Sequence, residues 1–210
     1  MDINKQIIKL SKGCPYSCPF CFNGKNDFEE LPMPEIKNNY VILHDDAFLS
    51  KHNVIDVINQ LGSMKINNKL IYYELTQGIN LKDLNQDIAN ALKLNRFINM
   101  RFTWDGSYTK KSMFRVYDGI KMLEKAGYKR KTMQCFVLSN YYVSYYECMK
   151  KLRMLLKWGI QVSNCIYKKN YLDPKIYPEH WTMKEIRQFF TFDCREHSQI
   201  VRHEIDVNVK

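Results

Sequence analysis

The sequence predicts an α/β fold in which parallel strands alternate with helices. Six segments rich in β-branched and aromatic residues recur along the 210 residues, and most are followed by apolar residues at helical spacing. No repeat, low-complexity tract or Gly/Ser linker interrupts this alternation. Crossover connections of this kind give a largely parallel sheet that is open, doubly wound or curled toward a barrel. Ligands of such sheets bind at the carboxyl ends of the strands.

The first half of the chain predicts three strands and two helices. Residues 5–10 read as a strand that runs into a cysteine-rich loop, and residues 40–44 as a short buried strand followed by a helix over 53–64. Residues 70–75 predict the third strand, which leads into a helix over 80–94 with leucine, isoleucine and alanine at helical spacing.

The second half continues the alternation. A strand over residues 97–104 precedes an amphipathic helix over 113–127, and a strand over 133–138 precedes a helix over 145–157. The sixth strand covers residues 159–167.

Beyond the sixth strand the pattern weakens. We expect one core domain over residues 1–170 and an extension over 171–210 that forms no separate domain. The tail from residue 193 shows weak β alternation, so it is expected to pair as an edge strand or to remain mobile.

Bulk composition narrows the class of protein. The sequence holds no run of eighteen apolar residues and its start lacks the pattern of a signal peptide, so a cytoplasmic protein without a membrane partner is expected. Seven cysteines in such a chain favour thiols and metal binding over disulfides. The formal charge of +10 favours an anionic partner.

The stretch "GCPYSCPFCFNG" places Cys14, Cys18 and Cys21 at C-x3-C-x2-C spacing just after the first predicted strand. Thiolates favour zinc or iron–sulfur clusters, and a structural zinc site normally has four protein ligands, often as two close pairs. No second pair exists here, and Cys135 and Cys165 resemble small apolar residues within strands. A four-iron cluster on three cysteines would leave one iron open to another ligand.

The motif "CPYSCPFC", with Phe20 before the third cysteine, resembles the C-x3-C-x-aromatic-C signature of the radical S-adenosylmethionine (radical SAM) enzymes. The segments "VILHDDAFLS", "ELTQGINLKDL", "RFTWDGS" and "AGYKRKTMQCFVLSNYY" resemble small uncharacterised radical SAM proteins of bacteria and phages.

The resemblance implies a partial (β/α)6 TIM-type barrel and a [4Fe-4S] cluster held by Cys14, Cys18 and Cys21. S-adenosylmethionine is then expected at the open iron, where its reductive cleavage yields a 5'-deoxyadenosyl radical that abstracts hydrogen from a substrate. An electron donor such as flavodoxin or ferredoxin is implied as a partner.

Residues near the cysteine motif and after the second and third strands are candidates for binding the cofactor. The resemblance implies a role for Phe20, and for Asp45 or Asp46 as acceptors of the methionine ammonium, where the family usually has Gly-Gly-Glu-Pro. Thr76 and Gln77 are expected to bind ribose or substrate. The alternatives are a helix cap or loop acid for the aspartates and an ordinary turn for Thr76 and Gln77.

The later strand ends add further candidates. Asp105, after Trp104 and before a glycine, suits hydrogen bonding to a ligand beside a stacking ring, although Asp-Gly is also a common turn. Val137 and Ser139 lie where the family commonly contacts adenine.

The basic charge gathers in one part of the chain. Between residues 93 and 157 there are fifteen Lys and Arg residues against four acids, with tyrosines interleaved. This pattern favours a nucleotide or nucleic acid as the unidentified substrate, although basic helix faces are often only solvated. Oligomeric state and the bond attacked stay open. The tyrosines are Tyr108, Tyr128, Tyr141, Tyr142, Tyr145 and Tyr146.

The competing hypothesis is a non-catalytic domain. In that interpretation the three cysteines and a fourth ligand, for which His44 is the candidate, bind zinc for stability, and the basic face binds nucleic acid.

Overall fold

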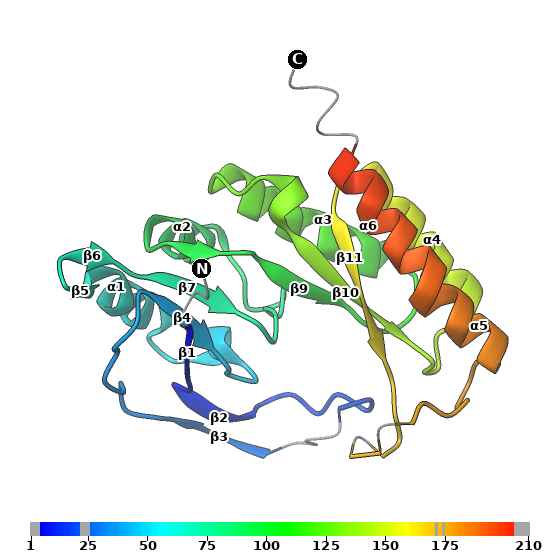
Figure 1. The fold of residues 1–210 in the computed structure, drawn as a ribbon, viewed down its shortest axis with the longest axis horizontal. Helices are drawn as coiled ribbons and strands as arrows, with labels where there is room; N and C mark the ends of the chain where they lie inside the picture. The colour runs from blue at the N-terminus through cyan, green and yellow to red at the C-terminus, as the bar shows by residue number, and fades with distance from the viewer. Residues whose placement is uncertain (1–4, 22–25, 171, 174, 204–210) are drawn as a thin grey trace. The chain divides into compact units, whose positions relative to one another are not determined.

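A computed structural model describes residues 5–21, 26–170, 172–173 and 175–203 (Figure 1). The chain divides into two compact units, each described separately below. Unit 1 comprises Met1–Arg101 and Gly119–Tyr128, and unit 2 comprises Phe102–Asp118 and Lys129–Lys210. No helix within the described ranges is long and apolar enough to cross a membrane. The predicted division into residues 1–170 and 171–210 stays a prediction.

Unit 1 is built on a four-stranded parallel sheet in the order β1-β4-β7-β8. Its strands are β1 (Lys5–Ile8), β4 (Tyr40–Leu43), β7 (Tyr72–Leu75) and β8 (Phe97–Ile98). They pair in register, so that Ile8 lies beside Leu43 and Leu43 beside Leu75. The predicted parallel arrangement of the first three strands is confirmed.

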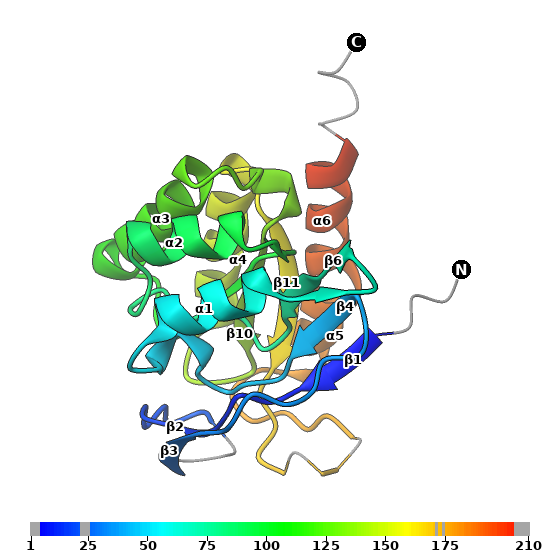
Figure 2. The ribbon, with the colours of Figure 1, turned by 90° about the vertical axis from the view of Figure 1, so that its left-hand side faces the viewer.

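One face of this sheet is apolar and packs against helices. The helices of unit 1 include α1 (Val54–Ser63) and α2 (Gln86–Leu94), which lie side by side in Figure 2. Tyr73 is wholly buried on this face, stacks on Phe97 at 5.2 Å between ring centroids, and donates its hydroxyl to the Leu61 carbonyl of α1 at 2.6 Å. The other buried side chains of this face are Ile8, Val41, Leu43 and Leu75.

The opposite face of the same sheet carries a buried polar network. Glu74 is 4% exposed; its carboxylate accepts from the Tyr40 hydroxyl at 2.5 Å and pairs with the Arg101 guanidinium at 2.5 Å. Burial and the Glu74 carboxylate raise the pKa of Tyr40 to about 12. The hydroxyl of the first residue of β4, the carboxylate of the third residue of β7 and the Arg101 guanidinium are therefore joined on this face of the sheet.

Two short hairpins in unit 1 were not predicted from the sequence. The antiparallel pair β2 (Ser11–Cys14) and β3 (Asn26–Glu30) flanks the cysteine loop, so the strand predicted over 5–10 ends early at Ile8. The pair β5 (Lys65–Ile66) and β6 (Lys69–Leu70) turns through asparagines in the left-handed region. Strands this short carry too little alternation to register in a sequence pattern.

The helix predicted over residues 80–94 is shorter in the structure. α2 begins at Gln86, because the Asn85 side chain caps it by accepting from the Ile88 N–H at 2.9 Å. Leu81, which precedes the cap, instead packs in unit 1 against Gly119, where an added Cβ would lie 2.8 Å from it.

The strand predicted over residues 97–104 is two strands. Asn99 adopts a left-handed conformation with φ of 52°, which ends β8, and β9 (Arg101–Trp104) joins the other sheet. β9 and the helix α3 (Lys110–Lys125) both cross the division between the units.

Unit 2 contains a three-stranded sheet in the order β11-β10-β9. β10 (Gln134–Ser139) pairs in parallel with β11 (Gln161–Ile166), and α4 (Tyr145–Lys157) has the predicted bounds. The remaining helical segments of unit 2 are η2 (Arg130–Thr132), α5 (Met183–Gln188), the π-helix η3 (Phe189–Asp193) and α6 (Cys194–His203); unit 1 also holds η1 (Phe48–Ser50).

The expectation of an edge strand or a mobile segment from residue 193 is wrong for residues up to His203. Cys194, His197 and Val201 are buried at helical spacing, and α6 packs along β11 and α4 (Figure 1). His197 is buried beside the Ile160 carbonyl, with its Nε2 at 2.8 Å from that oxygen. Because a histidine occupies one of these buried positions, the sequence shows no continuous apolar stripe for this helix.

Asn140 connects the end of β10 to the segment before α5. Its side chain is wholly buried, and its backbone is left-handed with φ of 57°. The amide satisfies groups that a loop would otherwise leave unpaired. Its Nδ2 donates to the carbonyls of Tyr167 and Tyr177, and its Oδ1 accepts from the N–H groups of Glu179, His180 and Trp181.

We expect Asn140→Ala to destabilise the protein by about 3 kcal/mol, because several buried hydrogen bonds and a favoured left-handed residue are lost together. Asn68→Ala is the matched control, since Asn68 also has a positive φ but lies in an exposed hairpin turn. It is expected to cost about 1 kcal/mol. Urea unfolding measures both, and equal losses would contradict the role given to Asn140.

Candidate functional site

The cysteine loop leaves the sheet through a bulge in the β2–β3 hairpin. Gly13, with φ of 74°, lies where the register shifts between Lys12 and Cys14. The Cys21 N–H donates to the Cys18 carbonyl at 3.0 Å, which forms a tight turn. Cys14, Cys18 and Cys21 are thiols and half-buried. Residues 22–25 lie outside the described part of the chain.

The surroundings of Cys14 disfavour its thiolate. Burial raises its pKa most, a backbone hydrogen bond at Tyr16 opposes this, and the charges of Cys21, Asp46 and Asp83 raise the pKa further. These groups therefore lie within electrostatic reach of Cys14. A bound cation would reverse the balance, since it stabilises thiolates directly.

Tyr16 anchors the middle of the loop. Its hydroxyl donates to the Asp83 carboxylate, whose other oxygen accepts from the Ser50 hydroxyl at 3.1 Å. Burial and this hydrogen bond raise the pKa of Tyr16 to about 12, so it remains a donor. The sequence did not indicate this anchor, because Asp83 fell within a predicted helix.

Two buried side chains of opposite charge hold the backbone that leads into the loop. Asp45 is 2% and Lys51 5% exposed. Asp45 Oδ1 accepts from the Leu10 N–H at 3.0 Å and the Ser11 hydroxyl at 2.6 Å, and the Lys51 ammonium donates to the Leu10 carbonyl. Both backbone groups of Leu10 are thus bound by side chains that follow β4.

Burial dominates the ionisation of both members of this pair. It raises the pKa of Asp45 and lowers that of Lys51, while each charge opposes the shift of the other. Asp45 Oδ2 is buried and has no hydrogen-bond partner among the described residues. The two predicted aspartates therefore differ in their surroundings, because Asp45 binds the backbone at Leu10 and the side chain of Ser11.

Asp46 is the more accessible acid of the two. Its carboxylate is 25% exposed and pairs with the Lys9 ammonium at 3.8 Å. Its charge acts on Cys14. Asp46 thus lies beside the cysteine loop.

Thr76 and Gln77 lie at the same edge of unit 1, directly after β7. Gln77 is exposed, and its Nε2 lies 2.9 Å from His44 Nε2, on the residue that follows β4. Thr76 is half-buried. Gly78, with φ of 83°, closes the turn by donating to the Leu75 carbonyl at 3.2 Å. The residues predicted to bind a ligand, Thr76 and Gln77, are therefore also the residues of this turn.

In unit 2, Asp105 lies in a turn fixed by a buried lysine. Lys151 of α4 is wholly buried and donates to the carbonyls of Trp104 at 3.0 Å and Gly106 at 2.5 Å. The charge of Asp105 acts on Lys151 and on Cys135. The carboxylate is therefore held close to β10, at the end of β9, and the sequence did not indicate the lysine that fixes it.

Val137 and Ser139 are buried in unit 2, at 0% and 2% exposure, and the Ser139 hydroxyl donates to the Cys165 carbonyl at 3.4 Å. Their contact with adenine stays a prediction. Cys135 is buried as predicted, whereas the packing role predicted for Cys165 is wrong because Cys165 is exposed. Alternation along β11 placed Cys165 on the uncovered face.

The three cysteines fit an iron–sulfur cluster by chemistry. Three sulfur donors lie within eight residues, and electrostatic coupling links Cys14 to Cys21. As they stand, no three Cys, His, Asp or Glu side chains among the described residues are grouped to hold a metal ion. Metal ions commonly organise their ligands on binding, so the fit rests on the chemistry of this donor set.

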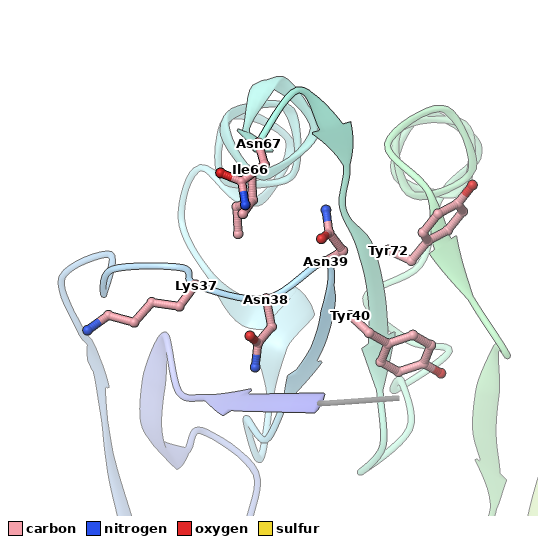
Figure 3. A pocket seen from close by; sticks show the side chains of 7 residues that line it. All are labelled: Lys37, Asn38, Asn39, Tyr40, Ile66, Asn67 and Tyr72. Atoms are coloured by element: carbon pink, nitrogen blue, oxygen red, sulfur yellow. The ribbon is translucent and has the colours of Figure 1, made fainter. Parts of the chain in front are cut away.

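A pocket of about 400 Å³ lies elsewhere in unit 1 (Figure 3). Tyr40 and Tyr72, which line it, are the first residues of β4 and β7. The pocket is therefore at the amino ends of the strands, whereas ligands of parallel sheets bind at the carboxyl ends. Its other lining residues are Lys37, Asn38, Asn39, Ile66 and Asn67.

No protein-family model and no curated protein matches the sequence. Among solved structures, the fold is similar to TsrM from Kitasatospora setae, a radical S-adenosylmethionine methyltransferase with cobalamin and a [4Fe-4S] cluster bound. The identity is 10% and the TM-score 0.56, over 77% of this chain and 36% of TsrM. It is also similar to HydG, a maturase of the [FeFe]-hydrogenase, at 14% identity and a TM-score of 0.58, over 93% of this chain and 50% of HydG.

At these identities the similarity concerns the fold. With the parallel strands of both units, it confirms the predicted fold class, an α/β core of the partial TIM-barrel type found in radical SAM enzymes. The chain spans no more than half the length of either enzyme.

We expect Lys51→Met to destabilise the protein by about 3 kcal/mol at pH 7, because it leaves the Asp45 carboxylate buried without its cation. Loss of Lys51 raises the pKa of Asp45 further, so the folded variant binds a proton more tightly than the unfolded chain does. The variant should therefore gain stability as the pH falls toward about 4, where the unfolded aspartate also protonates.

Lys12→Met is the matched control. Lys12 pairs with Glu29 at 2.7 Å on the same hairpin, but both side chains are more than half exposed. Such a pair contributes at most about 1 kcal/mol. Chemical denaturation between pH 4 and pH 8 measures both variants; a pH-independent loss in Lys51→Met would contradict the buried pair.

Proposed function

We propose that this protein is a radical SAM enzyme that binds a [4Fe-4S] cluster through Cys14, Cys18 and Cys21. The observation that carries the proposal is the place of these thiols, on the loop that follows β1, in a fold similar to that of a radical S-adenosylmethionine methyltransferase. Three cysteines leave one iron for a further ligand, which is the chemistry that S-adenosylmethionine binding needs.

When bound, the cluster would pass on one electron from an external donor, which would cleave S-adenosylmethionine to methionine and a 5'-deoxyadenosyl radical able to abstract hydrogen from a substrate. The chain's own residues shape the site. The Asp45–Lys51 pair and the Tyr16–Asp83 hydrogen bond fix both the entry and the middle of the cysteine loop. Phe20, before the third cysteine, is assigned to the cofactor as well.

Asp46 is our candidate for receiving the methionine ammonium. It lies beside the cysteine loop with a partly exposed carboxylate, whereas Asp45 Oδ1 is engaged by Leu10 and Ser11. An ionised carboxylate makes strong hydrogen bonds to an ammonium group. The Lys9 ammonium lies 3.8 Å from the Asp46 carboxylate, and the ligand's ammonium group would replace it as the partner of Asp46.

The other predicted residues have assigned roles in the proposal. Thr76 and Gln77 bind ribose or substrate from the edge of unit 1, and Asp105 supplies an acceptor at the end of β9. Backbone groups around Val137 and Ser139 serve the adenine, since both side chains are buried. An external one-electron donor such as flavodoxin or ferredoxin and a cytoplasmic location complete the proposal.

We expect Cys14→Ala, Cys18→Ala and Cys21→Ala each to lose the cluster and S-adenosylmethionine cleavage together, because each removes one of three ligands. Cys165→Ala, which removes an exposed thiol outside the motif, should keep both. Iron and sulfide per chain after anaerobic reconstitution, and 5'-deoxyadenosine formed under dithionite, are the measurements.

The same measurements distinguish the proposal from the zinc-binding alternative. Stoichiometric zinc, no cluster absorbance and no 5'-deoxyadenosine in the unaltered protein would overturn the proposal. Retention of a full cluster in Cys18→Ala would overturn the ligand assignment alone.

Asp46→Asn is expected to weaken S-adenosylmethionine binding at least about tenfold and to leave the iron content unchanged, because it removes a charge-assisted hydrogen bond. Asp56→Asn, on the exposed side of α1, is the control for loss of one negative charge. Equilibrium dialysis of the reconstituted protein measures the affinity. Equal affinity in both variants would remove Asp46 from the site.

A further inference from the structure

The structure sorts the six tyrosines interleaved with the basic residues into two groups. Tyr128 and Tyr141 are 5% and 7% exposed, and Tyr145 donates its hydroxyl to Asp193 at 2.8 Å, so these three rings support the fold. Tyr142 is 74% and Tyr146 61% exposed. Tyr142, Tyr146 and the half-buried Tyr108 all belong to unit 2.

Tyr146 and Tyr108 share one cation at the start of α4. The Lys150 ammonium lies 4.5 Å from the centroid of the Tyr146 ring and 6.0 Å from that of Tyr108. The Tyr108 N–H donates to Glu147 at 3.2 Å, and its ring stacks on Trp104 at 5.7 Å. Two aromatic rings and a lysine are therefore positioned by fixed elements.

Tyr142 forms a second aromatic surface just before the same helix. Its ring lies 4.2 Å from that of His180, with a tilt of 41°. Asn140, two residues before Tyr142, accepts from the His180 N–H at 3.4 Å. The residue on which the exposed Tyr142 ring rests, His180, is thus bound through its backbone to the wholly buried Asn140 side chain.

The charges around these rings are mainly positive. Two acids lie nearby. Glu179 is exposed and directly precedes His180. Glu147 caps α4 by binding Ser144, and hydrogen bonds from Ser144 and Tyr108 lower its pKa despite partial burial. Exposed cations are also present on α3 and α4, and cations attract phosphates. They are Lys110, Lys111, Arg153 and Lys157, beside the half-buried Lys150.

We propose that this aromatic–basic surface, formed by Tyr108, Tyr142, Tyr146, Lys150 and His180, binds unpaired bases of single-stranded nucleic acid. Exposed rings offer stacking platforms to successive bases, and the cations contact the phosphates between them. Such a surface discriminates against a duplex, whose bases are already stacked. That the bound strand is the substrate rests on the proposed function; the binding itself does not.

Fluorescence anisotropy of a labelled fifteen-nucleotide single-stranded RNA, titrated with the full-length protein, tests the surface. Tyr142→Ala and Tyr146→Ala are each expected to weaken binding about tenfold, the loss typical of one stacked base. Tyr142→Trp should keep the affinity because it keeps a stacking face. Phe190→Ala, which removes an aromatic side chain of similar exposure on η3, is the matched control and should bind as the unaltered protein does.

Three results would overturn the inference. They are no binding by the unaltered protein, equal affinity for a duplex of the same length, and unchanged affinity in both alanine variants. Displacement of the RNA by S-adenosylmethionine would assign the rings to the cofactor and would overturn it as well. Iron content and 5'-deoxyadenosine formation, measured on the same variants, report the proposed function separately, so either proposal can fail alone.

Discussion

The buried pair of Asp45 and Lys51 is the constraint on which the cysteine loop depends. Where the chain passes from the parallel sheet to the antiparallel hairpin, Leu10 keeps one backbone partner, because its carbonyl accepts from the Leu31 N–H at 2.8 Å. Two charged side chains from the segment after β4 add to this bond: the Asp45 carboxylate accepts from the Leu10 N–H, and the Lys51 ammonium is a second donor to the Leu10 carbonyl. Burying two charges is costly, and the arrangement is stable only because each charge also binds backbone.

The sequence predicted the elements whose local signals are complete. α4 has the predicted bounds because Ser144 and Glu147 form a capping box and because its buried residues recur at helical spacing. β8 and β9 were predicted as one strand because Asn99 carries no visible signal that its backbone turns left-handed. α6 was missed because a buried histidine and a cysteine take apolar positions that a pattern reads as polar or neutral.

For the candidate site, spacing identified the three cysteines, and the contacts that support them came only from the structure. Tyr16, Asp83 and Lys51 act through partners between about thirty and seventy residues away, which no single-sequence pattern connects. The two aspartates show the same limit. Their identity suggested a shared role, whereas the fold turns Asp45 inward to Leu10 and leaves Asp46 partly exposed.

The network of Tyr40, Glu74 and Arg101 has a mechanical consequence for unit 1. It ties the first residue of β4 to the third residue of β7 and to Arg101, so side chains link these strands in addition to their backbone ladder. Because β4 and β7 cannot slide past one another without breaking this network, the residues that follow them, His44 and Thr76, keep a fixed register at the carboxyl edge.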